Sequence, residues 1–125
     1  MIIGEVISNE ARIRLQVNGP RGRVQEVEAV IDTGYTASLT LPPDTIASLR
    51  LRWQSVDRGT LADGSECLFD VYEAQVVWDG KLRRVLVDEA DTDSLVGMEI
   101  LRGYELKMQI RPRGKVTIQR IRSKL

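Results

Sequence analysis

The chain has 125 residues, 18 basic and 18 acidic side chains, one Cys and no His. A hydrophobic share of 42% is enough for a buried core, and the length favours a single domain over residues 1–125. The lack of His excludes nucleophiles that need a His base, and one Cys excludes zinc clusters and an internal disulfide framework. The balanced charge argues against a nucleic-acid or membrane-surface binder. We expect no metal and no cofactor, so any chemistry must depend on carboxylates, hydroxyls or the backbone.

The N-terminal segment has no basic leader, and Glu5 interrupts its apolar run. This pattern is atypical of a signal peptide and favours a first strand. No segment reaches the ~20 apolar residues that span a bilayer. The single Cys67 fits a reducing compartment, so we expect a cytoplasmic protein.

All charged residues in the C-terminal segment from 111 onward are basic. Apolar residues such as Val116 and Ile118 alternate with these charges, which favours the polar face and end of a strand. A nucleic-acid or acidic-partner tail is the weaker alternative, because no aromatic residues are interleaved. The basic residues are Arg111, Arg113, Lys115, Arg120, Arg122 and Lys124.

Period-two alternation predicts a mainly β chain. The first clear strand includes 12–17, and a glycine-containing turn at 18–22 leads to a return strand that ends at Ile31. Val24 is out of phase with the apolar residues of that strand, which predicts a bulge. Both faces are apolar at 29–31, as is typical of a strand that enters a core.

A second group of elements follows the Asp-Thr-Gly at 32–34. Residues 36–41 predict a short strand, and the prolines at 42 and 43 favour a helix over 45–51. Two hairpins are expected at Asp63-Gly64 and Asp79-Gly80, because both central residues of such turns take positive φ.

The last part of the chain predicts a loop, a short helix and two strands. Residues 88–94 form an acidic loop, and 95–103 are expected to run from a strand through a glycine into a short helix closed by Gly103. The final strands are expected at 104–110 and 115–121. The elements together predict one mainly β domain with one or two short helices.

Asp32 is the first candidate for catalysis. It follows an apolar run and begins a tight turn, where partial burial makes a charged carboxylate costly and prepares it for acid–base chemistry. Thr33 offers a hydroxyl that can fix the loop, and Gly34 lets the backbone approach other atoms closely. The alternative is purely structural, because Asp-Thr-Gly is also a good turn sequence.

Residues 29–34 resemble the active-site motif of the retropepsin-like aspartic proteases, in which apolar residues precede Asp-Thr-Gly. Two further segments follow in the order that this family uses. Residues 59–65 resemble the flap hairpin that covers substrate, and 95–101 are similar to the late apolar–apolar–Gly element beside the active-site loop. The resemblance covers most of the chain and implies a retropepsin-like closed β-barrel.

The resemblance also implies roles for single residues. Asp32 is the catalytic carboxylate, and Thr33 and Gly34 complete its loop. The expected flap and substrate-binding residues are Leu61, Ala62, Asp63 and Gly64. Side pockets are expected to use Tyr35, Leu61, Ala62, Val96 and Ile100, each of which is equally well explained as ordinary core.

Three departures from the family pattern favour a cellular or bacterial relative. Tyr35 stands where the family usually has a small residue, and Thr36 and Ala37 stand where retroviral members often have an acidic one. The tip at 62–64 also lacks the glycine-rich sequence of viral flaps. These departures leave substrate specificity open.

The chemistry of the family needs two neighbouring carboxylates that share a proton. This chain has one Asp-Thr-Gly, so the second carboxylate is expected to be Asp32 of another copy, across a two-fold axis. We therefore expect a homodimeric aspartic endopeptidase that acts on peptide or protein substrates. The alternative is a catalytically inactive retropepsin-fold module that dimerises or binds peptides, because the Tyr35 ring would obstruct the water site.

Overall fold

The structure is a computed structural model that describes residues 1–122, so Lys124 of the basic C-terminal segment lies outside the described residues. In chain order its elements are β1 (Ile2–Ile7), β2 (Glu10–Asn18), the 3-10 turn η1 (Pro20–Gly22), β3 (Val24–Ile31), β4 (Leu39–Leu41), α1 (Pro43–Leu49), β5 (Arg52–Thr60), β6 (Glu66–Trp78), β7 (Lys81–Glu89), β8 (Ser94–Val96), α2 (Met98–Leu101), β9 (Tyr104–Met108) and β10 (Lys115–Arg120). The prediction of a mainly β chain with one or two short helices is confirmed, and the described residues contain two α-helices.

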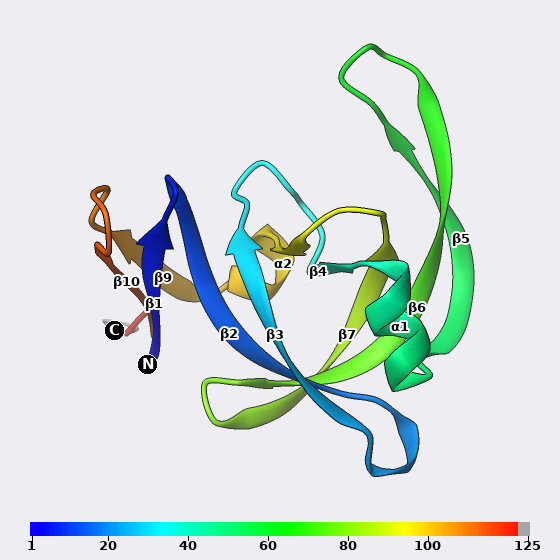
Figure 1. The fold of residues 1–125 in the computed structure, drawn as a ribbon, viewed down its shortest axis with the longest axis horizontal. Coiled ribbons are helices and arrows are strands. Elements are labelled where there is room, and N and C mark those ends of the chain that lie inside the picture. The colour runs from blue at the N-terminus through cyan, green and yellow to red at the C-terminus, as the bar shows by residue number, and fades with distance from the viewer. Residues whose placement is uncertain (123–125) are drawn as a thin grey trace.

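The strands of the described chain form one sheet in the order β5-β6-β7-β4-β8-β3-β2-β1-β10-β9. An additional pairing joins β2 to β6, so that β2, β3, β8, β4, β7 and β6 form a ring of paired strands (Figure 1). Alternate residues of these strands supply most of the buried core, and α1 and α2 add apolar side chains to it. The closed barrel itself stays a prediction.

Two tight hairpin turns have positive φ at both central residues. Asp79-Gly80 joins β6 to β7 in this way, as predicted, and Ser8-Asn9 joins β1 to β2 in a turn that the sequence did not signal. The turn at Asp63-Gly64 differs, because only Gly64 has positive φ. Leu61 N donates to Ser65 O and Gly64 N donates to Leu61 O, which makes a three-residue loop rather than the expected two-residue turn.

Several predicted boundaries are wrong for local reasons. The pairing of β2 with β3 is continuous as far as Val24, so the expected bulge is absent there, and Val24 simply lies on the exposed face. Only the last three residues of 36–41 form β4, because 35–38 hydrogen-bond to another part of the chain. Helix α1 begins at Pro43, where a missing N–H breaks no helical bond. The acidic loop is shorter than predicted, because Asp88 belongs to β7.

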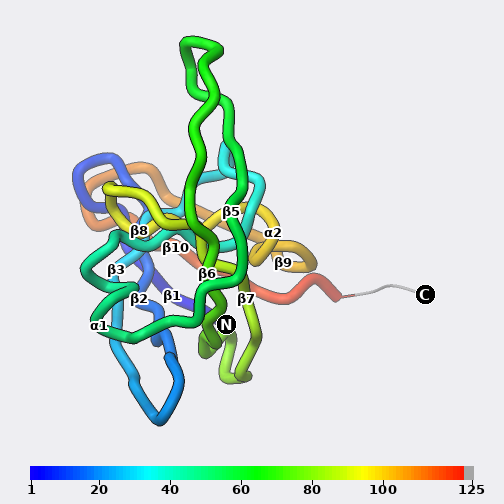
Figure 2. The backbone as a smooth tube through the Cα atoms, turned by 90° about the vertical axis from the view of Figure 1, so that its right-hand side faces the viewer, coloured from blue at the N-terminus to red at the C-terminus, as the bar shows by residue number. Residues whose placement is uncertain are grey.

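The β5–β6 hairpin projects from the rest of the molecule (Figures 1 and 2). Nearly every residue of β5 is exposed, including Trp53 and Val56, so the strand has no apolar face to signal it in the sequence. No helix in residues 1–122 is long and apolar enough to cross a membrane.

Candidate active site

The Asp32 carboxylate is held in a turn directly after β3. Asp32 N donates to Val96 O at 2.9 Å, which continues the parallel pairing of β3 with β8 for one more residue. Tyr35 N donates to Asp32 O at 3.1 Å and closes the turn. Gly34 N donates to Asp32 Oδ1 at 2.9 Å, so a backbone N–H orients the half-buried carboxylate. The neighbouring Thr33 is exposed.

The loop over 32–38 rests on the junction between β8 and α2. The backbone N–H groups of Gly97, Met98 and Glu99 donate to the carbonyls of Ser38, Tyr35 and Ala37 at 2.9, 2.8 and 3.1 Å. N–H groups at the start of a helix have no partner within it, so the loop satisfies donors that would otherwise be unpaired. The two segments therefore stabilise one another.

Gly97 is required at this junction because the loop approaches its backbone too closely for a side chain. A Cβ at this position would lie 2.2 Å from Ala37 O and 2.6 Å from Tyr35 Cδ2. Real Cβ atoms do not approach other heavy atoms so closely, and the nearest obstacle is backbone that cannot rotate away.

Tyr35 ties the loop to β7, the strand that pairs with β4. Its hydroxyl donates to Asp88 Oδ2 in β7 at 2.6 Å. Burial raises the pKa of the Tyr35 phenol, and the hydrogen bond to Asp88 raises it further. Burial also raises the pKa of Asp88, where the negative charge of Asp57 acts in the same direction and the Tyr35 hydrogen bond opposes it. The tyrosine therefore stays a neutral donor, and its ring has a fixed place.

A cleft of about 620 Å³ lies between this loop and the part of the β5–β6 hairpin next to its tip. The hairpin stem, defined here as 57–60 and 67–69, forms one wall, and the loop with the end of β7 forms the other. The lining residues are Gly34, Tyr35, Thr36, Ala37, Thr40, Asp57, Arg58, Gly59, Thr60, Cys67, Leu68, Phe69, Asp88, Glu89 and Ala90. A cleft of this size accommodates several side chains of an extended peptide.

The structure brings only part of the predicted site to this cleft. Gly34 and Tyr35 line it, whereas Asp32 and Thr33 lie beside it in the same loop. The hairpin tip, with the predicted flap residues Leu61, Ala62, Asp63 and Gly64, is exposed and does not line it. Val96 and Ile100 are both fully buried (0% exposed) and do not line this cleft, so their role as pocket walls stays a prediction. Val96 contributes its carbonyl to the loop instead, and its side chain belongs to the core.

Asp88 is the principal cleft residue that the sequence interpretation missed. Its acidic neighbours suggested a solvated loop, but β7 continues as far as Glu89. The alternation of buried Val85 and Val87 with exposed Leu86 puts Asp88 on the face away from the core. The sequence did not signal this alternation, because all three of these residues are apolar.

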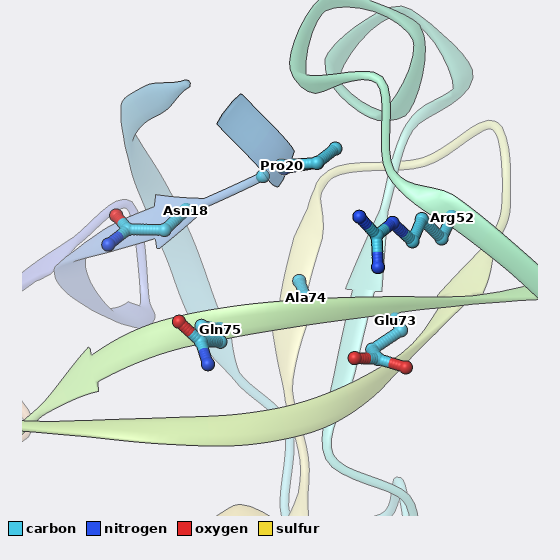
Figure 3. A pocket seen from close by; sticks show the side chains of 7 residues that line it. Asn18, Pro20, Arg52, Glu73, Ala74 and Gln75 are labelled. Atoms are coloured by element: carbon cyan, nitrogen blue, oxygen red, sulfur yellow. The ribbon is translucent and has the colours of Figure 1, made fainter. Parts of the chain in front are cut away.

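A second hollow, of about 160 Å³, lies where the end of β2 and η1 meet β5 and β6 (Figure 3). Its lining includes Asn18, Pro20, Arg52 and Glu73, and none of the predicted site residues. The Glu73 carboxylate accepts a hydrogen bond from Arg84 at 3.0 Å, so its charge is already partnered. We assign no chemistry to this hollow.

The described residues also contain no group of three or more His, Cys, Asp or Glu side chains that could hold a metal ion. The site therefore consists of one oriented carboxylate, its loop and the adjoining cleft.

Comparison with known proteins gives a likeness of fold. No protein-family model matches the chain, and no curated protein matches it in sequence. One of six matching solved chains is EIAV protease complexed with the inhibitor HBY-793, with a TM-score of 0.58 and 16% sequence identity over 77% of this chain and 88% of that chain. The chain therefore has a retropepsin-like fold, and this low identity extends the likeness no further than the fold.

The close approach at Gly97 predicts a large loss of stability on substitution. We expect Gly97→Ala to lower the free energy of unfolding by about 2–3 kcal/mol, because the added methyl group must displace the backbone of the loop. Urea denaturation measures this change. Gly59→Ala is the matched control: its Cβ would meet only the Phe69 ring, at 3.3 Å, and we expect a change below about 0.5 kcal/mol. Equal losses in the two variants would contradict this account of the loop.

The raised pKa of Asp88 predicts a pH-dependent cost to stability. The Asp88 carboxyl holds its proton more tightly in the folded state than in the unfolded state. Asp88 therefore has no effect on stability at a pH well below its ordinary pKa of 3.8. Its cost to the fold grows as the pH rises from there to its raised pKa in the folded state, and is constant above that. Asp88→Asn keeps an acceptor for Tyr35 but cannot ionise. We expect it to be more stable than the wild type at neutral pH and equal to it in strong acid. Thermal unfolding across pH measures the difference, which the exposed Asp91→Asn should not show.

Proposed function

We propose that this chain is one protomer of a homodimeric aspartic endopeptidase. The observation that carries the proposal is the Asp32 carboxylate, oriented by Gly34 N at the end of β3 and held in a loop that rests on Gly97. The retropepsin-like fold supports the proposal, because the same chain order brings a loop, a projecting hairpin and an apolar–apolar–Gly segment together.

In the proposed dimer, a two-fold axis runs between the two Asp32 loops. An isologous contact of this kind brings a residue close to its own copy, so one Asp in the sequence supplies both carboxylates. Thr33 is exposed beside Asp32 and is free to bond to the partner loop. The shared proton then belongs to the pair rather than to either residue.

The proposed reaction is direct hydrolysis by water. One carboxylate takes a proton from a water molecule while the water oxygen attacks the peptide carbonyl carbon, and the other carboxyl gives its proton to the carbonyl oxygen. When the tetrahedral species collapses, the C–N bond breaks and the amide nitrogen receives a proton from the pair. One hydroxyl on the same carbon returns a proton to the pair as its C=O bond forms, so the pair again holds one proton. No covalent bond to the enzyme forms at any step.

The cleft between the loop and the hairpin stem is the proposed place for substrate. An extended peptide there would pair its main chain with the hairpin in the manner of an added strand, and its side chains would enter the cleft. The exposed tip over 61–64 would act as the flap. The ring of six strands would act as the rigid frame, closed as a barrel, that keeps loop and hairpin in register.

Tyr35 favours one alternative, a retropepsin-fold module without catalysis. Its ring occupies part of the cleft and is fixed there by Asp88, next to the catalytic loop. A ring held in this place would limit the room for a water molecule or a substrate carbonyl. Peptide binding without cleavage would then be the function of the cleft.

The role of Asp32 predicts a specific loss of cleavage. We expect the wild-type chain to cleave members of a diverse peptide mixture at some pH between acidic and neutral, and Asp32→Asn to be slower by about 10³-fold or more. Mass spectrometry of the products measures both. Asp91→Asn changes an exposed acid in the same way and should keep full activity. Equal traces of cleavage by all three proteins would reveal a contaminant, and binding without cleavage would favour the non-catalytic module.

The shared pair also predicts a dominant effect of the inactive variant. Wild-type protein is mixed with about a ninefold excess of Asp32→Asn and the subunits are allowed to exchange. We expect cleavage to fall to about one tenth of that by the same amount of wild type alone, because random pairing gives about one wild-type protomer in ten a wild-type partner. The same excess of Asp91→Asn should raise total cleavage. Sedimentation should show a doubled mass for each protein. Cleavage that the excess of Asp32→Asn leaves unchanged would mean that one chain acts alone.

A further inference from the structure

A third hollow, which we name the basic hollow, lies outside the candidate active site. It measures about 380 Å³ and lies between the start of β7, the connection from α2 to β9 and the end of β10. Four of its lining side chains are the cations Lys81, Arg83, Arg102 and Arg120. None of its lining residues belongs to the cleft beside Asp32.

The charge of the basic hollow is not balanced by its own lining. It contains no carboxylate, and two acids from neighbouring segments do little to neutralise it. Glu99 reaches Arg102 only at 3.9 Å in an exposed pair, and Asp79 binds the N-terminal ammonium group. Four like charges around one concave surface repel one another and concentrate a positive potential there, which an anion would relieve.

The cationic side chains supply the hollow with hydrogen-bond donors. Arg83 Nη1 donates to Ile100 O at 2.9 Å, which positions the guanidinium and leaves its remaining N–H groups for a ligand. Trp78 also lines the hollow, is only 2% exposed, and has an indole N–H without an acceptor among residues 1–122. An edge contact with Tyr104, at 5.9 Å between ring centroids, fixes that indole. The indole nitrogen itself is closed to solvent, so Trp78 lies in the wall of the hollow as a fixed neighbour of a bound anion rather than as a donor to it.

We propose that the basic hollow binds an oxyanion of the phosphate class, either inorganic phosphate or a small phosphate monoester. Several arginine forks match the oxygens of a phosphoryl group, and its double negative charge suits a site with four cations better than a single carboxylate does. The volume of about 380 Å³ holds a phosphoryl group with a small substituent. The proposal does not depend on Asp32 or on protease activity.

The two tryptophans of the chain provide a direct test on the whole protein. In a nitrogen-15 NMR spectrum each indole N–H gives one peak, and Trp53→Phe assigns them. Inorganic phosphate is added while chloride keeps the ionic strength constant. We expect a saturable shift of the Trp78 peak and no saturable shift for Trp53, which is 56% exposed and donates to Asp70. No saturable shift of the Trp78 peak, or an equal shift with chloride alone, would overturn the proposal.

Charge variants make the test specific to the hollow. We expect Arg102→Ala and Arg120→Ala each to weaken phosphate binding about tenfold, because each removes a charge-assisted contact. Arg14→Ala removes an exposed arginine of β2 and should leave binding unchanged. An equal loss of phosphate binding in Arg14→Ala would mean that the overall charge of the protein, and not the basic hollow, determines binding, and would refute the site. Dispersed backbone amide peaks confirm that each variant is folded. The binding affinities of adenosine monophosphate, inorganic phosphate and adenosine are then compared. Tighter binding of adenosine monophosphate than of phosphate, without binding of adenosine, indicates a monoester ligand.

Discussion

The close packing of the Asp32 loop on Gly97 is the constraint on which the proposed site depends. Three backbone N–H groups at the β8–α2 junction donate to carbonyls of the loop, and Asp32 N donates back to β8. These bonds form only because Gly97 has no side chain. The catalytic candidate is thus positioned by main-chain contacts between two segments that lie far apart in the sequence. These main-chain contacts fix the Asp32 carboxylate in place, and Gly34 N occupies only one of its two oxygens.

The Tyr35–Asp88 hydrogen bond extends this arrangement along one wall of the cleft, from the loop to β7. Asp88 lies near the end of β7, and β7 pairs with both β4 and β6, so the loop is linked to the strand that carries the projecting hairpin. A buried carboxylate with a raised pKa is costly to the fold, and a neutral phenol is the kind of donor that makes its burial tolerable. Tyr35 therefore has a structural reason to be large, independent of whether the site hydrolyses peptides.

Much of the fold could be predicted from the sequence because its signals are local. The alternation in β2 and β3 and the Asp79-Gly80 turn each depend on neighbouring residues alone, whereas Gly97 is required by a loop that lies far away in the sequence. Features that depend on distant contacts could not be predicted in the same way. The exposed β5 has no apolar face, and the buried state of Val96 follows from strands that pack around it. The Asp-Thr-Gly identified the loop, but it carried no information about the tyrosine that follows or its partner in β7.

Charge segregation along β7 explains why overall composition was a poor guide to binding. The chain has equal numbers of acidic and basic residues, yet the start of β7 contributes Lys81 and Arg83 to one hollow while its end contributes Asp88 and Glu89 to another. Five residues of extended strand separate Arg83 from Asp88 by roughly 17 Å, which exceeds the Debye length of about 8–10 Å at physiological salt. Each end of the strand therefore presents its own potential to solvent. A zero net charge excludes a uniformly basic surface, but it does not exclude a local site for an anion.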